Sequence, residues 1–200
     1  MEFSAFSSMA IFALVASITP GPVNLVGLTS GTRHHLSVGL WFVTGATLGF
    51  VLLFIAIGLG LNQILLRFPA LNQILQWGGI AFLLYLSWIL LRDNGELGAD
   101  SEQSTDYAPS FMTGAIMQWL NPKAWLASAS GIAAYTDGQH IAEVLIFAGL
   151  YLPVCWFSLA SWVFVGAFLR RFVDNSAILR GINRVLALML LASCLLIILG

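Results

Sequence analysis

The first long apolar stretch of this chain is interrupted by Thr19-Pro20-Gly21-Pro22-Val23-Asn24, which we call the first break. The fourth apolar stretch is interrupted by Asn121-Pro122-Lys123-Ala124-Trp125, the second break. Proline lacks a backbone donor and clashes with the preceding turn, so each break should end or kink its helix. In hydrocarbon, freed backbone groups are tolerated only where they face protein or a water-filled cavity. Two such breaks at matching places in two halves therefore predict a transport site.

The composition of the chain is that of an integral membrane protein. Of its 200 residues, 59% are hydrophobic and 8% are charged, whereas soluble domains carry about 25% charged residues. Six stretches are long and apolar enough to cross a membrane, and they cover residues 4–30, 36–61, 70–91, 110–136, 141–168 and 180–199. We therefore expect an all-α polytopic membrane protein, with residues 1–200 forming a single transmembrane domain and no soluble domain.

The arginines predict how the chain is oriented. Loops after even-numbered stretches hold only Arg67, and loops after odd-numbered stretches hold the others: Arg33, Arg92, Arg170, Arg171, Arg180 and Arg184. Because basic residues favour cytoplasmic loops, both termini are expected to face outward. No Lys or Arg precedes the first stretch, so we expect it to remain in the mature protein and not to be removed as a signal peptide.

The polar segment of about residues 92–109 divides the chain into two sets of three stretches. Repeat one covers about residues 1–91, and repeat two covers about residues 110–200. Because each half has an odd number of stretches, the halves are expected to insert in opposite directions, as in an inverted repeat. The fold prediction is therefore six transmembrane helices arranged as two inverted three-helix repeats, with the first and fourth helices broken.

The first break is predicted to expose the start of a half-helix. Gly21 permits backbone angles that other residues avoid, and the helix can restart with Pro22 in its first turn. The N–H groups of Val23, Asn24 and Leu25 would then be unpaired donors at a positive dipole end. Such an end favours an anion such as a carboxylate, and the Asn24 amide can donate or accept a further hydrogen bond.

The second break has the same pattern and adds a charge. Asn121 is a typical helix cap, and Pro122 fits the first turn of a restarting helix. Lys123 follows at mid-membrane depth, where a cation costs about 3 kcal/mol on insertion scales and so usually faces a cavity or a partner. No carboxylate lies at the same depth. Its partner is then either backbone carbonyls or an anionic group of a substrate.

Together the two breaks suit a small zwitterion or anion. Unpaired N–H groups and a lysine would hold a carboxylate, freed carbonyls would hold an ammonium group, and the absence of a buried acid argues against a cationic substrate. A mere pair of helix kinks is the alternative interpretation. We predict one substrate-binding site at the membrane midplane, formed by Pro20, Gly21, Pro22, Asn24, Asn121, Pro122 and Lys123.

Other features are interpreted as structural. Cys155 and Cys194 sit in apolar runs without a paired-Cys motif, so they are expected to be small buried hydrophobes. The sequence shows no metal-ligand cluster, and no metal site is predicted. Gly45 and Gly49 indicate close helix packing, either within the chain or between subunits.

The residues of the two breaks also resemble those of a known family. Thr19-Pro20-Gly21-Pro22 and Asn121-Pro122-Lys123-Ala124 resemble signatures of the LysE/RhtB family of amino-acid exporters, and residues 79–86 resemble its third span. The length and the six-span layout match over essentially the whole chain. Many members carry Asp or Asn directly after Pro-Gly-Pro, where this chain has Val23. The cysteine/O-acetylserine subgroup is one match that the resemblance suggests.

The resemblance implies a secondary exporter that is not an enzyme and needs no cofactor. It would carry small amino acids or their derivatives across the bacterial inner membrane by alternating access, with protons as the coupling ion. Its partners would be the substrate and the lipid bilayer; a homodimer is left open, and nucleic acid is not expected.

Two other classes of protein are alternatives to an exporter. An ion or metal transporter or a channel of similar fold would use the same broken helices, but the positive charge of Lys123 disfavours a cation pore. A membrane-embedded enzyme or an assembly factor is the other class. The lack of clustered His, Asp or Ser at helical spacing disfavours an enzyme.

Overall fold

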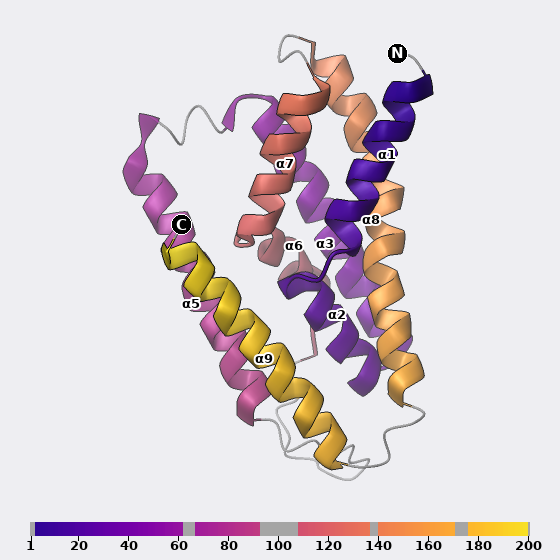
Figure 1. Cartoon of the computed structure of the whole chain (residues 1–200), viewed down its shortest axis with the longest axis vertical. Coiled ribbons are helices and arrows are strands. Elements are labelled where there is room, and N and C mark those ends of the chain that lie inside the picture. Colours follow the sequence, from indigo (N-terminus) through magenta and orange to yellow (C-terminus); the bar gives the residue numbers. More distant parts are fainter. Residues whose placement is uncertain (1–2, 62–66, 93–107, 137–139, 171–175, 200) are drawn as a thin grey trace.

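A computed structural model describes residues 3–61, 67–92, 108–136, 140–170 and 176–199. Within these ranges the chain is helical and contains no strand (Figure 1). The helices are α1 (Phe3–Ile18), α2 (Pro22–Arg33), α3 (Leu36–Gly58), α5 (Pro69–Arg92), α6 (Phe111–Trp119), α7 (Pro122–Tyr135), α8 (Ile141–Arg170) and α9 (Ser176–Leu199). The all-α fold class is therefore confirmed for the described residues.

Several of these helices have the length and composition of membrane spans. In the described part of the chain, α3 and α8 could each cross a membrane, and α1 together with α2, bent by 61°, could form a third span. These helices correspond to the predicted stretches 36–61, 141–168 and 4–30. Most of the segment that divides the predicted repeats, residues 93–107, and Arg171 lie outside the described residues.

Both helix breaks occur where the prolines predict them. α1 ends at Ile18 and α2 restarts at Pro22, while α6 ends at Trp119 and α7 restarts at Pro122. Each restarting helix has proline at its first position, where the missing N–H group costs nothing because no acceptor would be available to it.

Two pairs of helices approach so closely that their backbones touch. In the pair α2 and α8, a Cβ atom added to Gly31 would lie 2.0 Å from the carbonyl oxygen of Val163. In the pair α3 and α6, one added to Gly45 would lie 1.9 Å from the carbonyl oxygen of Phe111. A Cβ added to Gly49 would also meet α6, 2.6 Å from a carbonyl oxygen. The glycine pattern in the second stretch therefore serves packing within the chain.

A cluster of aromatic rings fills the space between α1, α3, α7 and α8. Phe147 of α8 packs edge-on against Phe54 of α3 at 5.0 Å and Tyr135 of α7 at 5.3 Å, measured between ring centroids. Phe12 of α1 packs edge-on against Tyr135 at 5.7 Å. Tyr151 of α8 joins the cluster through Phe147 at 5.6 Å. These four helices are therefore joined by side chains in this region.

The helices α5 and α9 form a pair along one side of the molecule (Figure 1). Ser87 Oγ of α5 donates a hydrogen bond to the carbonyl oxygen of Ala187 in α9, at 3.1 Å. Cys194 is buried in the same pair, and Cys155 is buried in α8. The prediction that both cysteines are buried is confirmed.

Candidate functional site

The two breaks, far apart in the sequence, meet in space. Lys123 Nζ of the second break donates a hydrogen bond to the backbone carbonyl of Thr19 in the first break, 104 residues earlier. A Cβ atom added to Gly21 would lie 3.0 Å from Lys123 Cδ and 3.4 Å from its Nζ. The lysine side chain therefore lies directly against the backbone of the first break.

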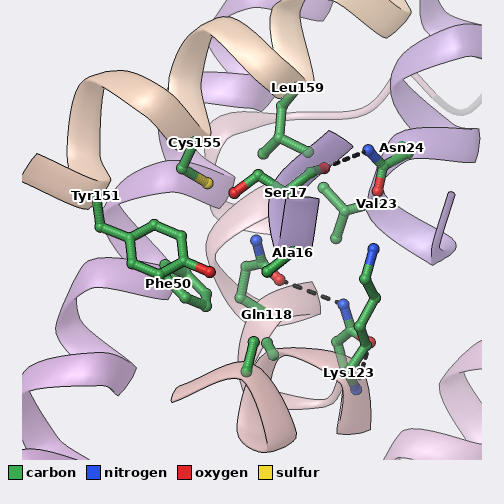
Figure 2. A pocket seen from close by; sticks show the side chains of 13 residues that line it. Ala16, Ser17, Val23, Asn24, Phe50, Gln118, Lys123, Tyr151, Cys155 and Leu159 are labelled. Carbon is green, nitrogen blue, oxygen red and sulfur yellow. Dashed lines mark hydrogen bonds between the residues drawn. The ribbon is translucent and has the colours of Figure 1, made fainter. Parts of the chain in front are cut away.

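A small cavity opens beside this contact (Figure 2). Side chains of α1, α2, α3, α6, α7 and α8, together with Asn121, line it: Ala16, Ser17, Val23, Asn24, Phe50, Gln118, Asn121, Lys123, Ala124, Ala127, Tyr151, Cys155 and Leu159. The space open to the centres of water molecules is about 30 Å³. That volume holds about one or two water molecules, so this conformation leaves no room for an amino acid.

The predicted site residues divide into a lining group and a shaping group. Asn24, Asn121 and Lys123 line the cavity, and Gly21 touches Lys123 from the side of the first break. The three prolines do not line the cavity: Pro20 is exposed, Pro22 is buried and Pro122 is half-buried. They shape the site by ending and restarting the helices that carry the lining residues.

The broken end of α1 is capped by side chains. Proline at positions 20 and 22 removes backbone donors that a continuous helix would supply to this turn. Three successive carbonyls instead accept from side chains: Ser17 from Asn24 Nδ2 at 2.9 Å, Ile18 from Trp162 Nε1 at 3.1 Å, and Thr19 from Lys123 Nζ. A substrate ammonium group that binds these carbonyls would therefore share them with, or displace, the side-chain donors that already occupy them.

The start of α2 differs from the prediction in one respect. The N–H group of Leu25 is not unpaired, because it donates to the carbonyl oxygen of Gly21 at 3.0 Å. That prediction was wrong because the carbonyl of the cap residue already accepts the first helical hydrogen bond. Within the described ranges, the N–H groups of Val23 and Asn24 have no acceptor. Gly21 has no side chain that could cap them.

The start of α7 is closed by its own residues. Asn121 Oδ1 accepts from the N–H group of Lys123 at 3.1 Å, as the helix-cap pattern predicts. The carbonyl oxygen of Asn121 accepts from the N–H group of Ala124 at 2.9 Å. Asn121 Nδ2 also donates to Gln118 Oε1 at 3.3 Å. Free backbone donors are therefore found at the start of α2 and not at the start of α7.

Lys123 is the charged residue of the cavity, and no Asp or Glu is among the lining residues. Its ammonium group lies at the C-terminal end of α1, where the partial negative charge of the helix dipole favours a cation. In the described part of the chain there is no group of three or more His, Cys, Asp or Glu that could hold a metal ion.

Several lining residues were missed by sequence reasoning. They are polar or aromatic residues on helices other than those of the breaks, or one turn before a break: Ser17, Phe50, Gln118, Tyr151 and Cys155. Gln118 carried a signal, because an amide three residues before Asn121 lies in the same apolar stretch. Tyr151 and Cys155 carried none, since nothing in the sequence indicates which face of α8 turns toward the breaks.

The chain is similar to a known family of translocators and to named efflux proteins. A family model described as LysE type translocator matches residues 14–200. The cysteine/O-acetylserine efflux protein of Salmonella choleraesuis is 26% identical over 177 residues, covering 84% of this chain and 86% of that protein. The protein of the same name from Escherichia coli O157:H7 is 26% identical over 201 residues, covering 96% of each. No solved structure matches the chain. Because the family model covers nearly the whole sequence, the chain belongs to the LysE type translocator family.

Proposed function

We propose that this protein exports small amino acids or their derivatives across the bacterial inner membrane. The observation that carries the proposal is the cavity where the two breaks meet, with Lys123 and the uncapped start of α2 at its wall. Efflux of cysteine and O-acetylserine, which names the similar proteins from Salmonella and Escherichia coli, supports a small amino acid as cargo.

The carboxylate of the substrate would bind at the start of α2. Two unpaired N–H groups, those of Val23 and Asn24, lie at the positive end of this helix, and such ends bind anions. Lys123 lies beside the same break and is held by the Thr19 carbonyl. A carboxylate is a stronger acceptor for an ammonium group than a neutral carbonyl. Arrival of the substrate would therefore draw Lys123 away from α1.

The size of the cavity and the packing of its two ends support transport by alternating access. An amino acid does not fit into about 30 Å³, so the helices must move to admit it. Toward α2 and α6, backbones touch at Gly31 and Gly45. Toward α1 and α7, the contacts are made by aromatic side chains such as Phe12 and Tyr135. Rotating rings displaces less structure than separating backbones, so the aromatic end would open first.

We also propose that six transmembrane helices form an inverted repeat. In Figure 1, α1 and α2 run in the direction opposite to α6 and α7, and α3 runs opposite to α8. This is the arrangement expected when two three-helix halves insert in opposite senses. The arginine distribution would then place both termini on the outer face. We further propose protons as the coupling ion, with Lys123 as the candidate carrier because it is the charged residue among those that line the cavity.

Counterflow in proteoliposomes tests the function. Vesicles loaded with an unlabelled amino acid are diluted into the same labelled amino acid, for a panel that includes cysteine, serine, alanine, lysine and glutamate. Uptake of a small amino acid should exceed that of protein-free vesicles, and an imposed proton gradient should raise net export. Ohmic currents independent of the gradient would indicate a channel. Absence of exchange across the whole panel would overturn the proposal.

A further inference from the structure

One wall of the cavity carries polar groups that the two breaks do not supply. Ser17 lies in the last turn of α1, and Tyr151 and Cys155 lie in α8. Figure 2 shows their hydroxyl, phenol and thiol groups directed toward one region of the cavity. The three side chains are nearly inaccessible from outside, with exposed fractions of 8%, 1% and 3% respectively. A buried cluster of this kind contacts whatever occupies the cavity.

The helical repeat of α8 explains why these groups face the same space. Tyr151, Cys155 and Leu159 are spaced four residues apart, so they form one stripe on the helix, and all three line the cavity. Ser17 is held opposite this stripe, because its carbonyl accepts a hydrogen bond from Asn24. Its hydroxyl points toward the same region of the cavity as the Tyr151 phenol and the Cys155 thiol (Figure 2). Along this stripe the side chains change from polar at Tyr151 and Cys155 to apolar at Leu159.

Because this wall carries no charge, it limits which substrate side chains can bind against it. The wall offers neutral donors and acceptors, and the one charged lining residue, Lys123, stands at the breaks. A cationic substrate side chain would meet no opposite charge among the lining residues, and an anionic one would compete with the substrate carboxylate for Lys123. Either would also lose its hydration. A hydroxyl, thiol or ester group could instead exchange hydrogen bonds with Ser17 and Tyr151. Phe50 and Leu159 also line the cavity, and their apolar side chains offer no further polar partner.

We infer that Ser17, Tyr151 and Cys155 form a subsite that recognises a small, uncharged, polar side chain of the exported amino acid. The inference rests on the proposed function, since it places the substrate carboxylate at the start of α2 and the substrate side chain toward α8. Polar selectivity then arises from α1 and α8, whereas the breaks recognise the groups that all amino acids share.

The test is counterflow with the variants Tyr151→Phe and Ser17→Ala, using serine, alanine and glutamate as competitors. Tyr151→Phe keeps the ring that packs against Phe50, with ring centroids 4.6 Å apart, and so preserves the fold. The wild type should prefer serine over alanine and exclude glutamate. In each variant, the preference for serine over alanine should fall by about tenfold, the change expected for the loss of one hydrogen bond. Ser161→Ala, which removes a hydroxyl of α8 that does not line the cavity, should leave the preference unchanged.

A second measurement does not depend on transport. In a Cys194→Ala background, Cys155 is the remaining cysteine, so its labelling by a small thiol reagent reports access to the subsite. Serine should slow this labelling and glutamate should not.

The outcomes separate the subsite from the function. Equal loss for all three amino acids in the variants, or a wild-type preference for glutamate, would overturn the subsite while export itself stands. Absence of all exchange would overturn the proposed function, and labelling would then decide the subsite. Protection of Cys155 by serine would support it, and lack of protection would overturn it.

Discussion

The two breaks share a proline pattern and have different structures. At the first break, three residues separate α1 from α2, the helices bend by 61°, and the carbonyls are capped by side chains from α2, α7 and α8. At the second break, two residues separate α6 from α7, and Asn121 caps the new helix with its own side chain.

The difference comes from one residue, the one before the restarting proline. Gly21 has no side chain and leaves the N–H groups of Val23 and Asn24 free, whereas Asn121 occupies the equivalent donor of α7. The same motif thus produces an end that can bind a ligand and an end that is closed. Lys123 follows the closed end in sequence, but its ammonium group lies at the open one.

The largest effect is expected for Lys123→Met, which removes the ammonium group that links the breaks. The Thr19 carbonyl loses its donor and the substrate carboxylate loses its counter-charge, so export should fall to the background of empty vesicles. Counterflow measures the rate, and size-exclusion chromatography in detergent confirms that folded protein is present. Lys123→Arg, which keeps the charge, should retain partial activity. Wild-type rates in the methionine variant would show that the lysine is not part of the site.

The glycine contacts between α2 and α8 and between α3 and α6 should matter almost as much. Gly31→Ala and Gly45→Ala each place a Cβ atom about 2 Å from a backbone carbonyl oxygen, which no side-chain rotation relieves. Overpacking of this kind costs about 3 kcal/mol of folding free energy. Thermal unfolding in detergent should show a lower transition temperature for both variants. The matched control is Gly149→Ala in α8, where nothing lies within 4 Å. A loss confined to one glycine would show that only one of these two helix pairs depends on close backbone contact.

A cap introduced at the first break tests the comparison directly. In Gly21→Ser, the new hydroxyl can accept from a free N–H group of α2, as helix caps do. The substrate carboxylate must then displace it, so KM should rise by about tenfold, equivalent to roughly 1.4 kcal/mol. Gly21→Ala adds the same Cβ atom beside Lys123 without the hydroxyl and is the control. If both variants raise KM equally, crowding of the lysine is the cause and the free donors do not bind substrate.

The smallest effect is expected at the closed break. Asn121→Ala removes the cap of α7 and should lower the free energy of unfolding by about 1 kcal/mol. Asn121→Ser, whose hydroxyl can also cap a helix, should restore most of that loss. Thermal unfolding in detergent measures both. A change in substrate selectivity without a change in stability would mean that this residue acts as a ligand and that the two breaks are more alike than their geometry indicates.

Much of this architecture could be predicted because its causes are local. Proline acts on its own turn and on the turn before it, so the ends of α1 and α6 and the restarts at Pro22 and Pro122 follow from the sequence. The low content of charge predicts a helical membrane protein. The depth of Lys123 predicts that it faces a cavity or a partner. The prediction that the N–H group of Leu25 is unpaired was wrong, because the carbonyl oxygen of Gly21 accepts it as the first hydrogen bond of α2.

The contents of the cavity could not be predicted, because they depend on how separate helices pack. The sequence by itself determined where the helices break and which charge lies between them. Only the tertiary structure decided that Lys123 reaches Thr19, that Trp162 caps Ile18, and that Tyr151 and Cys155 face the breaks. Apolar helices such as α8 have no polar face that marks an inward side. Their rotation is therefore set by contacts with neighbouring helices, many residues away in the chain.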